Sequence, residues 1–224
     1  MSHLHIPDGV LPLWLWGPAW FVTVVILIGV WRTQRDRKPQ RIAYEGALGA
    51  LMLAAMAMEV PFGPLEYHLT LAGPVGILLG PAGAFQAAFI ASAVLAFIGH
   101  GGLTLIGLNA LLVGTAAVLS ALAYHGIRQR LSGARAVAAA TAIGHSGSGI
   151  LWLLLVLVSA RMRATDLGLE TGGRLGVMSA VAVPMVLFGV LAESAVAFGL
   201  ARFILRVRPD LLPGAMAVGE GDSR

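Results

Sequence analysis

The sequence contains no cysteine, and charged residues make up only 12% of its 224 positions. The lack of cysteine excludes disulfides, iron–sulfur clusters and cysteine-ligated zinc sites. The low charge excludes a soluble globular domain, in which about a quarter of the residues are charged. Instead, 58% of the residues are hydrophobic and the mean hydropathy is +0.84. This composition predicts a membrane protein.

The apolar residues form long runs, which are typical of membrane-spanning helices rather than of β-barrel strands. A helix needs about 20 apolar residues to cross a bilayer. Five runs approach or exceed that length, at 13–31, 42–60, 103–124, 134–160 and 176–205. We therefore predict an all-α, polytopic transmembrane helical bundle. Residues 1–208 would form its single transmembrane domain, and residues 209–224 a short, polar cytoplasmic tail.

The basic residues predict the orientation of the chain. Twelve of the 15 lysines and arginines fall in three places, which are the connection after the first run, the connection after the third and the C-terminal end. Because basic residues accumulate in cytoplasmic loops, the C-terminus is expected inside and the N-terminus outside. The sequence predicts a multi-pass protein of a bacterial or archaeal plasma membrane.

The apolar stretch 69–98 is interrupted by Gly73-Pro74 and Gly80-Pro81. The predicted orientation requires this stretch to cross the membrane an even number of times, as two short helices broken at Gly80-Pro81 or as one re-entrant excursion. Backbone that is irregular at membrane depth lines a cavity or is buried in protein. The total is about seven membrane segments with an interrupted helical hairpin at 69–98, and His5, His68 and His100 fall on the outer side.

The N-terminal segment, Met1-Ser-His3-Leu-His5-Ile-Pro-Asp-Gly9, has the composition of a metal chelator. A histidine near a free terminus can bind a divalent ion through the terminal amine, deprotonated amide nitrogens and its imidazole. This planar, all-nitrogen arrangement suits Ni(II) or Cu(II). A second imidazole such as His68 can supply a remaining corner. Alone, two early histidines are a weak signal, and a solvated terminus explains them better.

Further motifs resemble the CbiM/NikM family, the substrate-binding membrane subunits of energy-coupling factor (ECF) transporters for cobalt and nickel. The resemblance is greatest at His100-Gly-Gly-Leu-Thr-Leu-Ile-Gly-Leu-Asn109, which is close to the family's His-Gly-Gly-Leu-Thr-Thr-Leu-Gly-Ala-Asn. Shorter similarities, in the order of the family, are His5-Ile-Pro-Asp-Gly9, Tyr67-His68-Leu69-Thr70, Gly76 to Pro81, Glu193-Ser194 and Arg206 to Leu212.

The resemblance implies that the N-terminal segment enters the bundle from outside. The ion, Co(II) or Ni(II), would be held as substrate by the terminal amine of Met1, the next amide nitrogen, His5 and His68, with no permanently bound cofactor. Since only neutral imidazole binds metal, binding should weaken as the pH falls through about 6.5, the reference histidine pKa. The implied partners are an integral membrane coupling subunit, ABC-type ATPase subunits, a separate small accessory membrane subunit and the lipid bilayer.

The N-terminus departs from the family pattern, in which the histidine is the second residue. If translation starts at Leu4, His5 is the second residue of the chain. If Met1 is removed, His3 is the second residue of the mature chain. Retention of Met1 would let Met1-Ser2-His3 form an amine–amide–amide–imidazole chelate. These three readings remain open, as does the choice between cobalt and nickel.

Three polar residues are candidates for supporting the site. His100 lies at a Gly-Gly break and could bind metal, orient a ligand or hydrogen-bond to loosened backbone. Asn109 should face protein, because an unpaired amide in hydrocarbon is costly. Glu193 lies deep in the last apolar run and should face the interior of the bundle, where intramembrane carboxylates find polar or cationic partners.

Two alternatives to this importer subunit belong to other classes. A secondary metal permease or channel would use the same metal donors without ATPases. An intramembrane serine protease is suggested by Gly144-His145-Ser146-Gly147, but a serine nucleophile needs a base within reach. The sequence has no histidine after His145, which points about 100° away from Ser146 on a helix. We therefore expect no enzyme activity.

Overall fold

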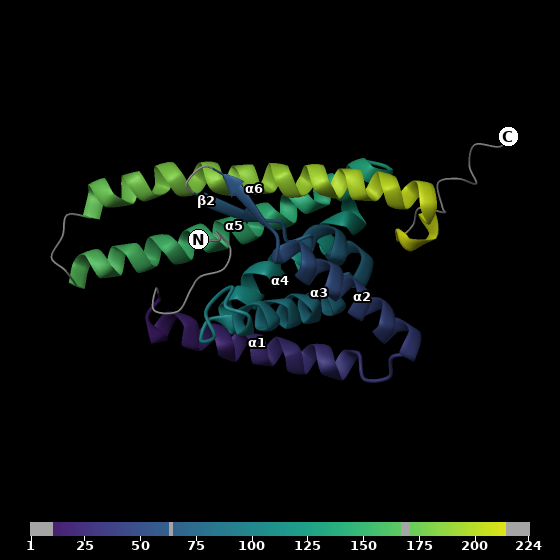
Figure 1. Cartoon of the computed structure of the whole chain (residues 1–224), viewed down its shortest axis with the longest axis horizontal. Coiled ribbons are helices and arrows are strands. Elements are labelled where there is room, and N and C mark those ends of the chain that lie inside the picture. Colours follow the sequence, from purple (N-terminus) through teal and green to yellow (C-terminus); the bar gives the residue numbers. More distant parts are fainter. Residues whose placement is uncertain (1–10, 63–64, 167–170, 214–224) are drawn as a thin grey trace.

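The computed structural model describes residues 11–62, 65–166 and 171–213 of the chain (Figure 1). Helices and one two-stranded antiparallel hairpin make up this part of the protein. In chain order they are α1 (Leu13–Thr33), α2 (Pro39–Met56), β1 (Glu59–Phe62), β2 (Leu65–His68), α3 (Ala72–Phe97), α4 (Ile106–Ile127), α5 (Gly133–Asp166), α6 (Thr171–Val207) and the 3₁₀ turn η1 (Pro209–Leu211). The prediction of a helical membrane bundle is confirmed.

Five of these helices contain segments that are long and apolar enough to cross a membrane: Leu13–Thr33, Ala72–Phe97, Ile106–Ile127, Gly133–Ser159 and Ala182–Val207. Helix α2 is not among them, and it carries Arg41 and Glu45 in its first two turns. The run 42–60 that we predicted as one span ends its helix at Met56. Its last two residues belong to strand β1, because the chain pairs there with β2 instead of continuing as a helix.

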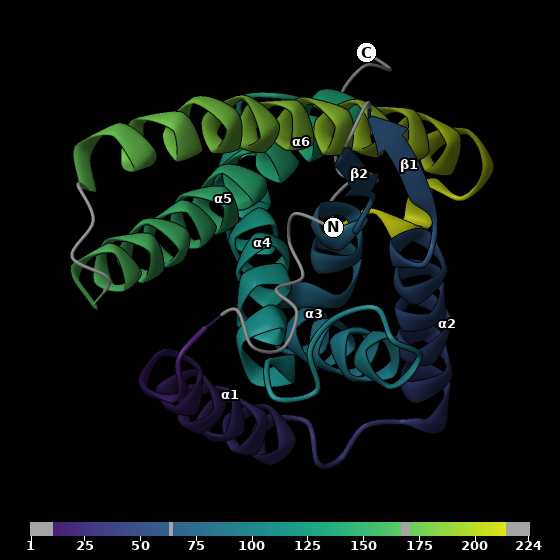
Figure 2. The same cartoon turned by 60° about the vertical axis from the view of Figure 1, so that its left-hand side comes forward.

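Helices α3 and α4 form the centre of the bundle, with α5 and α6 as a long pair on one side and α1 on the other (Figures 1 and 2). The central pair is closely packed because Gly76 of α3 lies against the backbone of Ala117, where a Cβ would overlap the carbonyl group. Two hydrogen bonds, one exposed and one buried, hold helix α1 to the start of α4. Trp20 Nε1 donates to Thr104 O at 2.7 Å, and Thr23 Oγ1 donates to Gly107 O at 2.8 Å.

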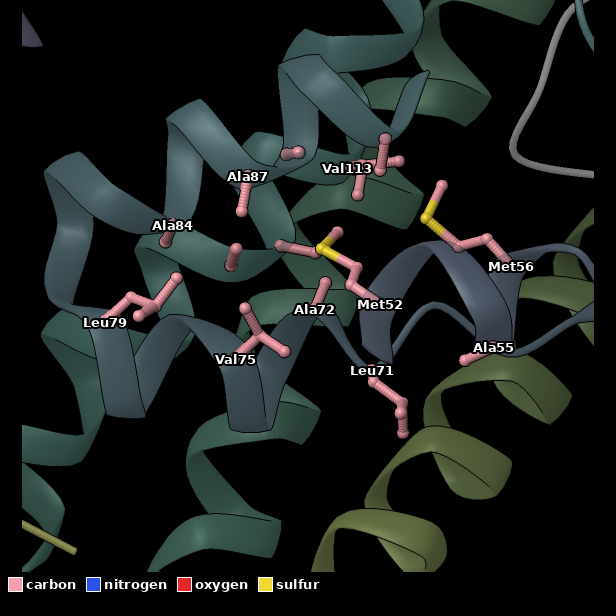
Figure 3. Close-up of a cluster of buried hydrophobic side chains, with 14 of the residues drawn as sticks. Met52, Ala55, Met56, Leu71, Ala72, Val75, Leu79, Ala84, Ala87 and Val113 are labelled. Atoms are coloured by element: carbon pink, nitrogen blue, oxygen red, sulfur yellow. The ribbon is translucent and has the colours of Figure 1, made fainter. Parts of the chain in front are cut away.

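Helix α3 is broken at Gly80, whose backbone angles of φ 75° and ψ 170° are open only to glycine. The chain turns back there, so that Ala84 and Ala87 of the second arm lie over Leu79 and Val75 of the first (Figure 3). Met52 of α2 inserts between the two arms, and Val113 of α4 completes this apolar cluster. The predicted interruption at 69–98 is thus present.

The two arms of α3 differ in length. Residues 72–79 of the first arm span about 12 Å at 1.5 Å per residue, which is less than half the ~30 Å hydrocarbon core. The first arm is therefore too short to cross a bilayer, which agrees with a re-entrant hairpin. The predicted count of seven membrane segments is not confirmed, because five helices in the described residues meet the length and hydropathy expected of a span, and one of these five is the broken helix α3.

The tip of the hairpin is held by charged residues from α2. Because the break at Gly80 frees the carbonyl of Leu79 from the helix, this oxygen accepts a hydrogen bond of 2.7 Å from Arg41 Nη2. Arg41 Nε also donates to Glu45 Oε1 at 2.9 Å, and Arg37 forms an ion pair with the same carboxylate. Side-chain charge thereby replaces the backbone bond that the break removes.

The connection from α2 to α3 is a β-hairpin that the sequence analysis did not predict. Its register pairs Glu59 with His68 and Phe62 with Leu65. Strand β2 leads directly through Leu69–Leu71 into α3. His68, the last residue of β2, is therefore fixed between a paired strand and a buried helix.

The chain beyond α6 begins by packing against the end of α4. Leu212 is buried, and Pro213 O accepts hydrogen bonds of 3.3 Å from Tyr124 Oη and Arg128 Nη1. The domain boundary that we placed after residue 208 remains a prediction.

Candidate metal centre

Three of the predicted metal donors, Met1, His3 and His5, lie outside the described residues. His68 and the three supporting candidates His100, Asn109 and Glu193 lie within them. The described part of the predicted site is therefore the pocket wall around His68.

His68 is 5% exposed and its imidazole has a fixed orientation. The Nδ1 atom lies 2.8 Å from Met56 O in the last turn of α2. A carbonyl can only accept, so Nδ1 carries the proton and donates it. In the neutral ring the lone pair is then on Nε2, and the bond to Met56 sets the tautomer that leaves this nitrogen as a metal ligand.

His100 lies next to His68, although the whole of α3 separates them in the sequence. The two ring centroids are 6.1 Å apart and the rings are nearly perpendicular, at 79°. Gly99 and Gly101 on either side adopt positive φ angles of 90° and 116°, which an L side chain would adopt only with strain. The hairpin of α3 therefore starts at one histidine and ends at the other.

Glu193 of α6 is fully buried and binds the turn that follows His68. Its Oε1 accepts hydrogen bonds from the backbone N–H of Thr70 at 2.5 Å and from the Thr70 hydroxyl at 2.7 Å. Its Oε2 accepts from the backbone N–H of Leu71 at 3.2 Å. The carboxylate thus satisfies two backbone donors at the start of α3, where no side chain of the helix itself acts as a cap. The interior placement predicted for Glu193 agrees with the structure.

His145 of α5 is the polar partner of Glu193. Its Nε2 lies 3.5 Å from Glu193 Oε1 and 3.1 Å from Thr70 Oγ1, and its Nδ1 lies 3.1 Å from Thr141 O. Because a carbonyl can only accept, Nδ1 carries a proton and donates it to Thr141 O. Nε2 then faces the Thr70 hydroxyl and the Glu193 carboxyl group, which links α5 to α6 through the turn before α3.

Tyr67 completes this buried group. Its hydroxyl donates to Gly189 O at 3.3 Å, and its ring meets the Phe188 ring edge-on at 5.4 Å. Burial raises the pKa of Tyr67, and the nearby Glu193 carboxylate raises it further. The phenol therefore stays protonated and ties β2 to α6 rather than offering an anionic oxygen to a metal.

Asn109, the remaining candidate, is 1% exposed in the first turns of α4, so it faces protein as predicted. The sequence analysis missed Thr70 and His145 as members of the site. An ionisable residue in the middle of the apolar run 134–160 was the available signal, because such residues are functional by default. We had considered His145 only beside Ser146.

The Gly-His-Ser-Gly segment of α5 is used for packing instead of catalysis. His145 binds Thr70 and Thr141, and Ser148 Oγ donates to Leu112 O of α4 at 2.7 Å. A Cβ on Gly144 would overlap Ser120 and the backbone of Ala116. The protease interpretation therefore has no support in the geometry of this segment.

Within residues 11–62, 65–166 and 171–213, no group of three or more histidine, aspartate or glutamate side chains could hold a metal ion. His68 and His100 form a pair only. A metal site at this position would need donors besides these two imidazoles.

Comparison with known proteins identifies the fold and the family. A family model described as "Cobalt uptake substrate-specific transmembrane region" (CbiM) matches residues 5–211. The chain belongs to this family. The resemblance inferred from the motifs is thereby confirmed, and a cobalt-uptake region is a transport component, which agrees with the prediction that the chain is not an enzyme.

Similar members of the CbiM/NikM group come from archaea and bacteria. The chain is 25% identical to the fused cobalt transport protein CbiMQ of Methanocorpusculum labreanum, over 99% of this chain and 38% of that protein. It is 25% identical to the fused nickel transport protein NikMN of Archaeoglobus fulgidus, over 97% and 70%. It is 27% identical to the cobalt transport protein CbiM of Geobacter sulfurreducens, over 97% and 64%. The chain thus spans between 38% and 70% of the length of these relatives.

Two crystal structures share the fold of this CbiM-family chain. A transition metal transporter superposes with a TM-score of 0.77 at 16% identity, over 91% of this chain and 93% of that one. A truncated transition metal transporter gives a TM-score of 0.73 at 17% identity, over 90% and 98%. These similarities confirm a multi-pass membrane fold across nearly the whole chain.

Proposed function

We propose that this CbiM-family chain is the substrate-capture membrane subunit of an ATP-driven importer of Co(II) or Ni(II). The observation that carries the proposal is His68, a buried imidazole at the base of the α3 hairpin whose Nδ1–H is bound to Met56 O. In a chain of this family, that arrangement presents the Nε2 lone pair as one nitrogen ligand for a divalent transition metal.

The remaining donors in this proposal come from the N-terminal segment. The described residues contain no group of three or more metal-binding side chains, so His68 needs additional donors to hold an ion in this proposal. The match of the family model begins at His5, which supports this histidine as the counterpart of the family's N-terminal ligand. His3 and the amine of Met1 remain alternative donors. All-nitrogen, planar coordination suits Ni(II) and can also hold Co(II), and the relatives carry names for both metals.

Partners and orientation belong to the same proposal. An importer driven by ATP requires ATPase subunits and a membrane coupling subunit, because the sequence contains no Walker A lysine motif. The fused relatives named CbiMQ and NikMN support assembly of such regions with further subunits. With the basic connections cytoplasmic, His68 and His100 face the outside, and the ion is captured there before the subunit releases it inward.

Metal binding by the purified full chain tests the proposal. We expect Ni(II) and Co(II) to bind the wild type, and His68→Ala to weaken binding by more than about 100-fold, since loss of an outer partner alone typically costs about 10–100-fold. The exposed His125 at the far end of α4 provides a matched control, and His125→Ala should bind as the wild type does. Unchanged affinity in folded His68→Ala would refute the site.

A secondary metal permease remains the alternative. Cells that lack the partner ATPases should lose uptake of radioactive Ni(II) or Co(II), measured with competing unlabelled metal, if the chain works in an ATP-driven complex. Uptake by the chain alone would instead establish a permease or channel.

A further inference from the structure

The turn between His68 and α3 is strained. Leu71, the residue before the helix, has a φ of 53° and a ψ of 19°, and it is the one non-glycine residue with positive φ in the described part of the chain. A leucine in this left-handed region persists only where the surrounding structure holds it, and such residues cluster at functional sites. The strained residue here lies three positions after the proposed ligand.

Interactions from two other helices hold this turn. Glu193 of α6 binds the backbone N–H groups of Thr70 and Leu71, one with each carboxylate oxygen. The Thr70 hydroxyl donates to Glu193, accepts from the backbone N–H of Ala72 at 3.1 Å, and lies 3.1 Å from His145 Nε2 of α5. Three consecutive backbone N–H groups are thus bound by one carboxylate and one hydroxyl.

This arrangement costs more than a helix cap requires. A helix N-terminus is ordinarily capped by one short polar side chain, whereas here a carboxylate and an imidazole from two other helices are buried in the bundle. Glu193 is 0% exposed and His145 is 6% exposed, and His145 Nε2 lies 3.5 Å from Glu193 Oε1. Capping alone therefore does not explain why two buried ionisable side chains, from α5 and α6, meet at the turn before α3.

We infer that Thr70, Glu193 and His145 are positioning residues for the metal ligand His68. They hold the strained turn so that the His68 ring enters the site from one fixed backbone position, while the bond from Nδ1 to Met56 fixes its rotation. The inference rests on the proposed function of His68. It adds a second set of residues, on α5, on α6 and in the turn before α3, that determine metal affinity without touching the ion.

Four variants of the full chain test this inference by Ni(II) binding. Thr70→Val keeps the shape but removes the hydroxyl, Thr70→Ser restores the hydroxyl, and Glu193→Gln removes the charge and one acceptor. Ser148→Ala is the matched control, because it deletes a buried bond between α5 and α4 that lies outside the turn. The readouts are the Ni(II) dissociation constant, the visible absorption of bound Ni(II), which depends on ligand orientation, and the melting temperature.

We expect Thr70→Val and Glu193→Gln to weaken Ni(II) binding by about 10–100-fold and to shift the Ni(II) absorption. Thr70→Ser should retain the wild-type constant and spectrum, and Ser148→Ala should change only the melting temperature. If Thr70→Val or Glu193→Gln lowers the melting temperature but leaves affinity and spectrum unchanged, the role is purely structural and the inference is wrong. Should Glu193→Gln fail to fold, the comparison of Thr70→Val with Thr70→Ser decides whether the turn positions His68.

The same experiment separates this inference from the proposed function. A wild-type chain that binds no Ni(II), or a His68→Ala chain that binds it as tightly as wild type, overturns the proposed function. Loss of binding in His68→Ala together with normal binding in Thr70→Val and Glu193→Gln overturns only the positioning role.

Discussion

At the scale of single residues, the closest helix contacts of this bundle depend on glycine. Lipid tails are as apolar as the helices, so association relies on close packing and interhelical hydrogen bonds. Gly76 lets α3 lie on the backbone of α4 at Ala117, and Gly144 lets α5 do the same at Ala116 and Ser120. These contacts align the helices that deliver His68, Thr70 and His145.

Gly76→Ala tests this packing. A Cβ there would overlap Ala117 O, a backbone atom that can move only with its helix, so we expect a loss of about 1–3 kcal/mol in stability. The control is Gly46→Ala in α2, where a Cβ meets nothing within 4 Å. Thermal unfolding followed by the fluorescence of the five tryptophans measures both. Equal melting temperatures for the two variants would contradict the packing argument.

At the scale of elements, the broken helix α3 determines the geometry of the site. A continuous helix over 72–97 would be about 39 Å long and would place its two ends on opposite sides of a membrane. The reversal at Gly80 brings the end of α3 back, so that His100 meets His68 with ring centroids 6.1 Å apart. The pair of imidazoles therefore depends on a residue at the far tip of the hairpin.

Gly80→Ala should strain this reversal. Alanine at φ 75° and ψ 170° costs about 1–3 kcal/mol, and relief of that strain would displace one arm of α3 from the other. We expect a lower melting temperature and weaker Ni(II) binding, although Gly80 is remote from the ligands. Gly126→Ala, in the last turn of α4 with open space around a Cβ, is the control. Unaltered stability and metal binding in Gly80→Ala would show that the break does not set the site.

At the scale of the whole molecule, capture from outside requires that the site and the basic connections lie on opposite membrane faces. His68 follows the C-terminal end of α2, whereas Arg37 before α2 and Arg41 in its first turn bond to Gln86 and Leu79 near the tip of the α3 hairpin. The base and the tip of the hairpin therefore lie at opposite ends of the short helix α2. The orientation predicted from the basic residues would place the base outside and the tip inside, and it remains a prediction.

The absence of cysteine makes this orientation directly testable. Single cysteines at Met58, which is 59% exposed after α2, and at Ser132, which is exposed before α5, mark the two ends of the bundle. We expect a membrane-impermeant maleimide to label Met58→Cys in intact cells and Ser132→Cys only after permeabilisation. The cysteine-free parent reports background labelling. Labelling in the reverse pattern would place His68 on the cytoplasmic side.

Much of the helical fold could be predicted from the sequence, because a membrane span is a long apolar run that can be recognised by its length and hydropathy. The run 13–31 corresponds to α1 within two residues. The β-hairpin 59–68 was not foreseen, since its first strand begins inside the apolar run 42–60 and contains Pro61, which is unfavourable in a strand. The second strand, Leu65–His68, does alternate apolar and polar residues, but over four residues only, the shortest length at which alternation indicates a strand. The count of membrane segments was not confirmed for a related reason, because hydropathy does not report whether a short helix crosses the membrane or returns.

The candidate site likewise has a part that could be predicted from the sequence and a part that could not. The chain's composition determined a membrane protein, and local motifs identified His68, His100 and Glu193 as residues that bear chemistry, because those signals lie in short stretches of sequence. Only the tertiary structure decided that Glu193 and His145, from two different helices, meet at the Thr70–Leu71 turn. Hydrogen bonds between residues 123 positions apart depend on how helices pack. That packing is set by the summed shape of many small side chains, which no single motif encodes.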